Sequence, residues 1–365
     1  MGMKGLQAGE KAKETRSERY ETASRIVRLA KREHVDFVLV AGDLFEDHDV
    51  DETVVRKTVT VLNSFAPIPV FVLPGNHDPV IAGSVWDRRS WRQVSDNVIL
   101  MVKAAEIPVK DGVVIYPSPL HQRQSMMDPT EWIPSRAQKD DRIRIGVAHG
   151  SLNLLPEKTN FPIESDRASK TDLDYLALGD WHGFLQDGKA VYSGTMEQTS
   201  FSEKDPGNVV LVRIAKGGDN PVISKQRVGK LVWSEYRPLI HDLTDVEQLR
   251  SDIGAPNALT NQLIRVVPAF PPDFSEEVVT ELEILRKELA DEVFFLDWPE
   301  EPVKLPIDTK ITIPNGTLSD VDSCLAAILD GRIPEGPGRE FASVDLTVVT
   351  EARALLRRLV KEAQH

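Results

Sequence analysis

Short apolar runs that each end in a side chain able to bind a ligand recur along the first two hundred residues. The run VDFVLVAGD (35–43) ends in Gly-Asp, and PVFVLPGNHD (69–78) ends in Asn-His-Asp. Uninterrupted apolar runs of this length are typical of parallel strands buried on both faces. A segment with helical periodicity precedes each run, at 14–33 and at 51–65. The alternation predicts an α/β fold with parallel strands and right-handed crossovers.

Five more predicted strands extend this pattern toward residue 214. Three of them end in polar residues, namely His149 in one, Asp180 with His182 in another and Ser193 before Gly194 in the third. Ligands of open α/β sheets bind beyond the carboxyl ends of the strands, so these side chains are expected to share one crevice. The five predicted strands are 112–117, 143–150, 174–180, 189–194 and 207–214.

Composition narrows the class of protein. The net charge of −13 argues against a generally basic surface for gripping nucleic acid, although basic residues can still cluster locally. Cys324 is the single cysteine, which excludes an intramolecular disulfide and a cysteine-based zinc site. The absence of an apolar run near the roughly 18 residues of a membrane helix predicts a chain without a membrane span, and we expect a cytoplasmic location.

The candidate metal ligands mix oxygen donors with imidazole. Such a set suits Mn²⁺, Fe²⁺ or Zn²⁺ better than Ca²⁺. Each residue alone has a structural interpretation: a helix cap, a turn former or a core histidine. Their common position after predicted strands favours a metal site instead. The candidates are Asp43, Asn76, His149, Asp180 and His182.

Two more residues of the Asn-His-Asp turn are candidates for catalysis. A carboxylate such as Asp43 can bridge two cations, and two cations lower the pKa of a bound water and clamp a phosphoester. His77 is then placed to protonate a leaving alkoxide or to steady the phosphate. Asp78 would orient the His77 imidazole.

The motifs GDLF, PGNHD, VAHGS and GDWHG, in this order, resemble those of the calcineurin-like metallophosphoesterases. Within that superfamily the chain is similar to the SbcD-type DNA repair exonuclease subunits, over about residues 14–235. The resemblance implies a β-sandwich flanked by helices and a two-metal site that uses Mn²⁺, with Mg²⁺, Fe²⁺ or Zn²⁺ as alternatives. It implies that Asp43 bridges the metals and His77 is the catalytic histidine. Asn76, His149 and Asp180 would hold one metal and His182 the other.

Two departures from the family pattern bear on this site. The family's first strand ends in Asp-x-His, whose side chains complete the His182 side, but residues 1–14 contain neither Asp nor His. Either the chain starts too late or one metal site has been lost. We expect one well-formed and one impaired metal site, and strands left with unpaired backbone groups unless another segment or a partner fills the gap. Asp180 stands where the family usually has His, which should alter metal affinity without abolishing binding.

Basic and aromatic residues near the Asn-His-Asp turn are candidates for contact with substrate. Arg88, Arg89 and Arg92 alternate with Trp86 and Trp91. This pattern fits a groove that tracks a nucleic-acid strand, and it fits helix packing equally well. Two further candidates for phosphate contact, for which an ordinary loop is the alternative, are His121 and Arg123.

The sequence divides into a predicted phosphoesterase domain (1–235), a small α+β capping domain (236–300) and a tail with Pro- and Gly-rich linkers (301–365). A predicted basic amphipathic helix at 346–364 either folds back on its own domain or docks on an SMC-like ATPase, as the resemblance implies. The resemblance also implies a homodimer through the 14–33 and 51–65 helices.

These observations predict a metal-dependent DNA phosphodiesterase that acts as the nuclease subunit of an SMC-like ATPase complex. One alternative is a phosphoesterase for small nucleotides. Another is a DNA-binding or scaffold subunit without catalysis, because the Asp-x-His ligands are missing.

Overall fold

The computed structural model divides the chain into two compact units, Met1–Val232 and Trp233–His365, and each is taken by itself below. Near the carboxyl end it describes only residues 348–350, 352–353, 355–356 and 360. The longer segments that it describes are 6–110, 112–154, 160–217, 220–254, 259–270, 275–299, 303–304 and 316–329.

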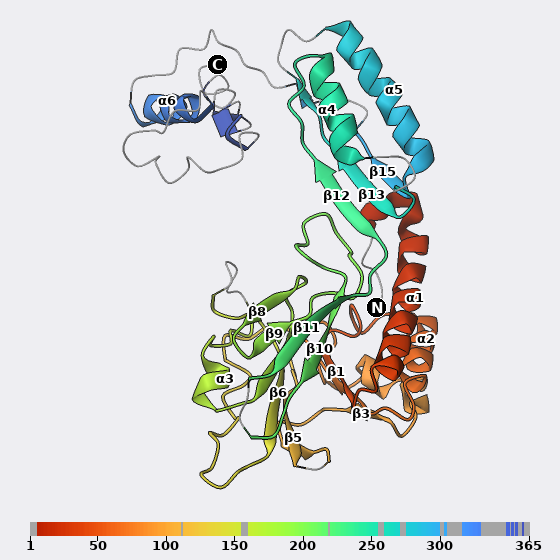
Figure 1. Cartoon of the computed structure of the whole chain (residues 1–365), viewed down its shortest axis with the longest axis vertical. Coiled ribbons are helices and arrows are strands. Elements are labelled where there is room, and N and C mark those ends of the chain that lie inside the picture. Colours follow the sequence, from red (N-terminus) through yellow and green to blue (C-terminus); the bar gives the residue numbers. More distant parts are fainter. Residues whose placement is uncertain are drawn as a thin grey trace. The chain divides into compact units, whose positions relative to one another are not determined.

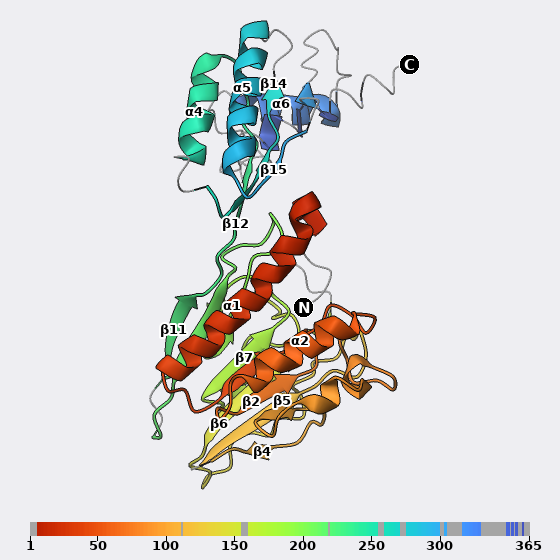
Figure 2. The same cartoon turned by 90° about the vertical axis from the view of Figure 1, so that its right-hand side faces the viewer.

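The first unit opens with two helices and a parallel sheet (Figure 1). Helices α1 (Ala12–Arg32) and α2 (Glu52–Asn63) lie side by side, as Figure 2 shows. Their apolar side chains pack on one face of a three-stranded sheet in the order β1-β2-β3. All pairs are parallel, as the strand–helix–strand pattern predicts, and the strands are β1 (Val38–Ala41), β2 (Val70–Leu73) and β3 (Val98–Leu100).

A six-stranded sheet, in the order β4-β5-β6-β7-β9-β8, forms the second layer of this unit. Its centre is parallel, from β5 through β6 and β7 to β9, and the outer strands β4 and β8 pair antiparallel. The strands are β4 (Ile107–Pro108), β5 (Val113–Ser118), β6 (Ile143–His149), β7 (Tyr175–Gly179), β8 (Leu185–Asp187) and β9 (Ala190–Tyr192).

The two sheets face each other across a shared apolar core. Phe71 and Leu73 of β2 pack with Ile115, Val147 and Ala177 of the larger sheet. The antiparallel hairpin of β10 (Asn208–Arg213) and β11 (Val222–Arg227) packs on the same core. This layered α/β arrangement confirms the predicted fold class, a β-sandwich flanked by helices.

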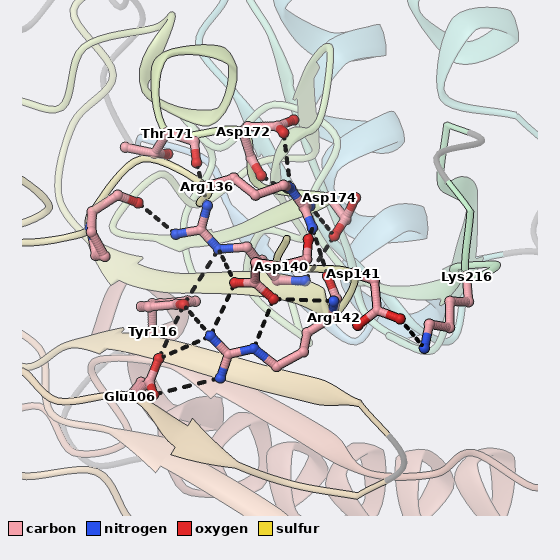
Figure 3. A network of polar contacts seen from close by, with 12 residues as sticks. Glu106, Tyr116, Arg136, Asp140, Asp141, Arg142, Thr171, Asp172, Asp174 and Lys216 are labelled. Atoms are coloured by element: carbon pink, nitrogen blue, oxygen red, sulfur yellow. Dashed lines mark hydrogen bonds and ion pairs between the residues drawn. The ribbon is translucent and has the colours of Figure 1, made fainter. Parts of the chain in front are cut away.

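A network of polar contacts around a buried arginine links β5 and β6 of the larger sheet to the segment before β7 (Figure 3). Arg144 of β6 is 1% exposed. It donates to the Thr171 carbonyl at 2.6 Å and lies over the ring of Tyr116. Arg136 donates to Asp174 at 2.8 Å, and Asp174 also accepts from the Arg144 backbone at 2.7 Å. Because these polar groups have partners, burying them does not incur the full cost of desolvation.

The second unit has its own core of apolar side chains from two helices and a small sheet. Strand β13 lies between β12 and β15 in this sheet. The elements are β12 (Val232–Tyr236), α4 (Leu243–Ile253), β13 (Gln262–Val266), β14 (Ala269–Phe270), α5 (Glu276–Glu292), β15 (Phe295–Asp297), β16 (Val303–Lys304) and α6 (Thr317–Leu329).

The segment between β12 and α4 makes a single parallel bridge, between Leu239 and Ala269. Asp242 then caps α4 by accepting from the Thr244 backbone N–H at 2.8 Å. Strand β1 is where the sequence predicts it, but each of its residues is only half-buried. The reason is that β1 has a paired neighbour on one side only, within the described part of the chain.

Most of the helix predicted at 346–364 lies outside the described residues. None of the helices that the structure describes has both the length and the apolar character needed to cross a bilayer.

Candidate metal centre

The carboxyl ends of β1, β2, β6 and β7 bring the predicted ligands together. Asp43 lies two residues after β1, Asn76 three after β2 and Asp180 one after β7. His149 is the last residue of β6. Parallel strands deliver their carboxyl ends to the same edge, and this explains why residues so distant in sequence meet.

His149 is the centre of this group. Its ring is buried, and Nδ1 contacts the Ala41 carbonyl at 2.8 Å. Nε2 faces three oxygen-bearing side chains: it lies 2.9 Å from Asn76 Oδ1, 3.3 Å from Asp43 Oδ2 and 3.8 Å from Asp180 Oδ1. Because a carbonyl can only accept, Nδ1 carries a hydrogen, and the Nε2 lone pair of the neutral ring is directed at the oxygens.

The two acidic neighbours change the protonation of His149. Burial lowers the pKa of His149, but Asp43 and Asp180 outweigh burial and raise the pKa to about 9. Burial likewise raises the pKa of Asp43, yet His149 and the His77 backbone N–H outweigh it and hold the pKa of that carboxyl well below its usual value. A positive charge at this point is therefore stabilised by its surroundings.

Two glycines allow the close approach of these loops. A Cβ atom on Gly42 would lie 2.1 Å from His149 Nδ1, and one on Gly75 would lie 2.2 Å from Asp43 Oδ1. The backbone φ angles of Asp43 and Asp180 are positive, 53° and 105°, and residues other than glycine rarely adopt such angles. Such backbone strain concentrates at functional sites, where the surrounding structure holds it in place.

The residues present fit a divalent cation at His149 Nε2. Within the described residues, no group of three or more His, Cys, Asp or Glu side chains is arranged to hold a metal as it stands. The candidate site also includes the amide oxygen of Asn76, which is not one of these four residue types. Three side chains nevertheless direct oxygens at Nε2 of one imidazole, and a cation replacing the Nε2 proton would have two carboxylates to balance its charge.

His77 lies beside this group and has 43% of its side chain exposed. Its Nδ1 contacts the Glu46 carbonyl at 2.9 Å, and its Nε2 lies 4.0 Å from Asp43 Oδ2. The His77 backbone N–H also donates to Asp43 Oδ1 at 2.9 Å. The histidine is thus fixed at one nitrogen and accessible at the other.

Asp78 has a different environment from the one the sequence suggests. It is fully buried, and its carboxylate accepts from the Phe45 backbone N–H at 2.9 Å and from that of Gly75 at 2.7 Å. Burial and the nearby charge of Asp43 raise the pKa of Asp78 to about 6. The expected orientation of His77 by Asp78 is replaced by the contact between His77 Nδ1 and Glu46. Asp78 instead joins the loops after β1 and β2.

His182 lines the same cavity as Asp43 and Asp180. Its Nδ1 contacts Glu203 at 2.8 Å, and Glu203 also accepts from the Thr199 backbone at 2.8 Å. Sequence analysis missed Glu203, because 21 residues separate it from His182 and no motif marks the pair. It also missed Ser151, which donates to Asp180 at 2.7 Å and is the last residue of the VAHGS motif.

The basic residues predicted to contact substrate have varied environments. Arg88 donates to the carbonyls of His48 and Val50 and so holds the loop after β1. Arg89, Arg92, His121 and Arg123 are exposed.

The tryptophans that alternate with these arginines lie in the core. Trp86 and Trp91 are 7% and 5% exposed and pack edge-to-face on each other and on Phe45. They are therefore not available to stack on bases, and of the two interpretations of this segment the structure supports packing.

Comparisons with known proteins agree with this site. Residues 16–187 match the family model of the calcineurin-like phosphoesterases. The chain is 24% identical over 302 residues to the uncharacterized metallophosphoesterase YhaO of Bacillus subtilis (strain 168), with 77% of this chain and 72% of the relative covered. It is 25% identical over 167 residues to the DNA double-strand break repair protein Mre11 of Sulfurisphaera tokodaii, which covers 45% of this chain and 42% of that relative.

In fold and in these matches, the chain is similar to the calcineurin-like metallophosphoesterases, a class of hydrolases that use divalent metals. Of the particular relatives, one carries the general description of a metallophosphoesterase and the other is a DNA repair protein.

Proposed function

We propose that the chain is a metal-dependent phosphodiesterase that cleaves DNA with Mn²⁺, as the nuclease subunit of an SMC-like ATPase complex. The observation that carries the proposal is the convergence of Asp43, Asn76 and Asp180 on Nε2 of His149, with His77 next to Asp43. DNA as substrate rests on the likeness to the Mre11 relative, of whose length this chain spans less than half. The ATPase partner, and a homodimer through α1 and α2, rest on the family resemblance alone.

Each side chain has a role in this proposal. Asp43, Asn76, His149 and Asp180 would hold one cation, and His182 would contribute to a second. When bound, the cations supply positive charge that activates water and neutralises the phosphate. Since Nδ1 of His77 is engaged by the Glu46 carbonyl, Nε2 is the nitrogen that can donate a proton to the departing 3′ oxygen.

The test compares hydrolysis of bis(p-nitrophenyl) phosphate with cleavage of single- and double-stranded oligonucleotides in the presence of Mn²⁺. We expect His77→Ala to slow both reactions by about 10²- to 10⁴-fold, the range for loss of a proton-transferring group. Mn²⁺ binding should persist in this variant. The matched control is His241→Ala, which changes a largely exposed histidine of the second unit. Absence of cleavage with every divalent ion would overturn the proposal, and hydrolysis of the aryl ester alone would favour a small-molecule phosphoesterase.

One observation favours a second candidate, a subunit that binds or scaffolds without catalysis. No group of three or more His, Cys, Asp or Glu in the described part of the chain is arranged to hold a metal. Metal stoichiometry of the purified protein distinguishes the two candidates, because a value near zero after incubation with Mn²⁺ favours the scaffold.

A further inference from the structure

The two carboxylate oxygens of Asp180 have different surroundings. Oδ1 lies 3.8 Å from Nε2 of His149, at the candidate metal centre. Oδ2 accepts a hydrogen bond of 2.7 Å from the hydroxyl of Ser151. Because Ser151 is buried, this hydrogen bond is shielded from competing water. The hydroxyl therefore fixes which oxygen of Asp180 faces His149.

The second carboxylate of the site is divided in the same way. Oδ1 of Asp43 accepts from the backbone N–H of His77 at 2.9 Å, and Oδ2 lies 3.3 Å from Nε2 of His149. Asn76 has a single side-chain oxygen, which lies 2.9 Å from the same nitrogen. Asp43, Asn76 and Asp180 therefore each present one oxygen to one point, although a carboxylate that is free to turn can present both.

The hydroxyl of Ser151 is itself held in place by the backbone around it. The Ser151 carbonyl accepts from the Ile163 backbone N–H at 2.8 Å. The hydroxyl of Tyr192, a fully buried residue at the end of β9, binds both neighbours of Ser151. It donates to the Gly150 carbonyl at 2.6 Å and accepts from the Leu152 backbone N–H at 2.9 Å. Ser151 is thus pre-organised by the sheet rather than carried on a free loop.

Divalent cations differ in how they use a carboxylate. Ca²⁺ takes about six to eight oxygen ligands in a flexible geometry and often binds both oxygens of one carboxylate. Mg²⁺ is smaller and demands a near-ideal octahedron, and octahedral oxygen sites also suit Mn²⁺. Single oxygens from three side chains around one imidazole nitrogen therefore favour a small octahedral cation over Ca²⁺.

We propose that Ser151 is a specificity-determining residue of the metal centre: by holding Oδ2 of Asp180, it limits this carboxylate to one ligand oxygen and so selects Mn²⁺ over Ca²⁺. Ser151 acts through Asp180 and is a positioning residue, not a ligand. Without the hydroxyl, the carboxylate can turn and present both oxygens, which is the arrangement that Ca²⁺ accepts. This inference rests on the metal site of the proposed function, but it does not depend on DNA as the substrate.

The test measures cation affinities of the full chain without any substrate. Electron paramagnetic resonance of free Mn²⁺ gives the Mn²⁺ affinity, and displacement of bound Mn²⁺ gives the Ca²⁺ affinity. We expect Ser151→Ala to weaken Mn²⁺ binding by about 10- to 100-fold, the usual effect of removing a group that orients a metal ligand. Ca²⁺ binding should stay the same or become tighter, so the ratio of the two affinities falls by about tenfold or more.

The matched control for Ser151→Ala is Ser135→Ala. It also removes a serine hydroxyl that donates a hydrogen bond, in this case to the Lys170 carbonyl at 3.3 Å, but from an exposed position. Both cation affinities should remain unchanged in this variant.

A second background separates the orientation of Asp180 from a general loosening of the loop. Asp180→His replaces the carboxylate with an imidazole, which has no second oxygen for the hydroxyl to hold. In this background, Ser151→Ala should change the Mn²⁺ affinity by no more than about twofold, because effects of two residues that act through one contact are not additive. Asp96→His, at an exposed position, controls for the added histidine and should leave the effect of Ser151→Ala intact.

Three outcomes would overturn the proposal. An unchanged ratio of Mn²⁺ to Ca²⁺ affinity in Ser151→Ala would show that the hydroxyl has only a structural role. An equally large effect of Ser151→Ala in the Asp180→His background would show that the hydroxyl acts elsewhere. Absence of cation binding by the unchanged chain would overturn both this inference and the proposed metal site. A chain that binds Mn²⁺ with the expected selectivity but cleaves no DNA would instead overturn the proposed function alone.

Discussion

Individual residues determine whether this site can bind a cation. His149 is held by the Ala41 carbonyl at one nitrogen and faces two carboxylates with the other, so its surroundings favour positive charge whether a proton or a metal supplies it. A proton and a metal ion therefore compete for Nε2 of His149. Metal binding should depend on pH, because a cation must displace the Nε2 proton.

The first prediction at this scale concerns the protein stripped of metal by EDTA. Burial lowers the pKa of His149, but Asp43 and Asp180 raise it to about 9 in the folded state, above the value of about 6.5 that is usual for histidine. The resulting stability is fully present below pH 6.5 and is lost as the pH rises through about 9. We expect the free energy of unfolding, measured with urea, to fall by about 3 kcal/mol over this range.

Asp43→Asn provides the comparison for this pH dependence. It removes the nearer carboxylate, so the pKa of His149 should fall and the decline in the free energy of unfolding between pH 6.5 and 9 should become much smaller. Parallel curves for the two proteins would show that the decline comes from other groups.

The second prediction concerns Glu203, whose side chain is only 4% exposed and contacts His182 Nδ1. We expect Glu203→Gln to weaken Mn²⁺ binding by about 10- to 100-fold, the usual effect of removing a carboxylate that orients a metal-binding histidine. Isothermal titration calorimetry measures the affinity. Glu21→Gln, at an exposed position of α1, is the matched control. Equal affinities for the two variants would mean that Glu203 has only a structural role.

At the scale of elements, the sequence predicts which strands exist better than it predicts what lies beside them. The apolar run at 35–43 and the PGNHD turn mark β1 and the loop after β2 correctly, because periodicity and Pro-Gly chemistry are local properties. The half-burial of β1 depends on its place at the edge of the sheet, with a paired neighbour on one side only in the described part of the chain. That information is not in the run itself.

Contacts between side chains illustrate the same limit. Asp78 was expected to orient His77 because the two are adjacent in the turn, yet its carboxylate binds the backbone of Phe45 and Gly75. The positions of Asp43, Asn76, His149 and Asp180 were predictable because each follows a strand. The contacts of His182 with Glu203 and of Asp180 with Ser151 depend on how loops fold over the sheet, which propensity does not encode.

At the scale of the whole molecule, each unit has a core of its own. The apolar clusters of the first unit contain residues up to 223, and that of the second contains residues from 236 to 298. Independent cores imply that the units can unfold separately, since cooperativity follows from shared packing.

Differential scanning calorimetry of the intact chain and two matched variants tests this independence. Leu285 and Leu173 are 1% and 0% exposed, in the cores of the second and first unit respectively. Truncation of a buried leucine to alanine costs about 2 to 5 kcal/mol through lost burial and the cavity left behind. We expect two transitions, of which Leu285→Ala lowers that of the second unit and Leu173→Ala lowers that of the first. The shift should be roughly 10 °C or more for the smaller second unit and roughly 5 to 10 °C for the larger first unit, Met1–Val232. A single transition lowered equally by both variants would instead show that the two cores unfold as one.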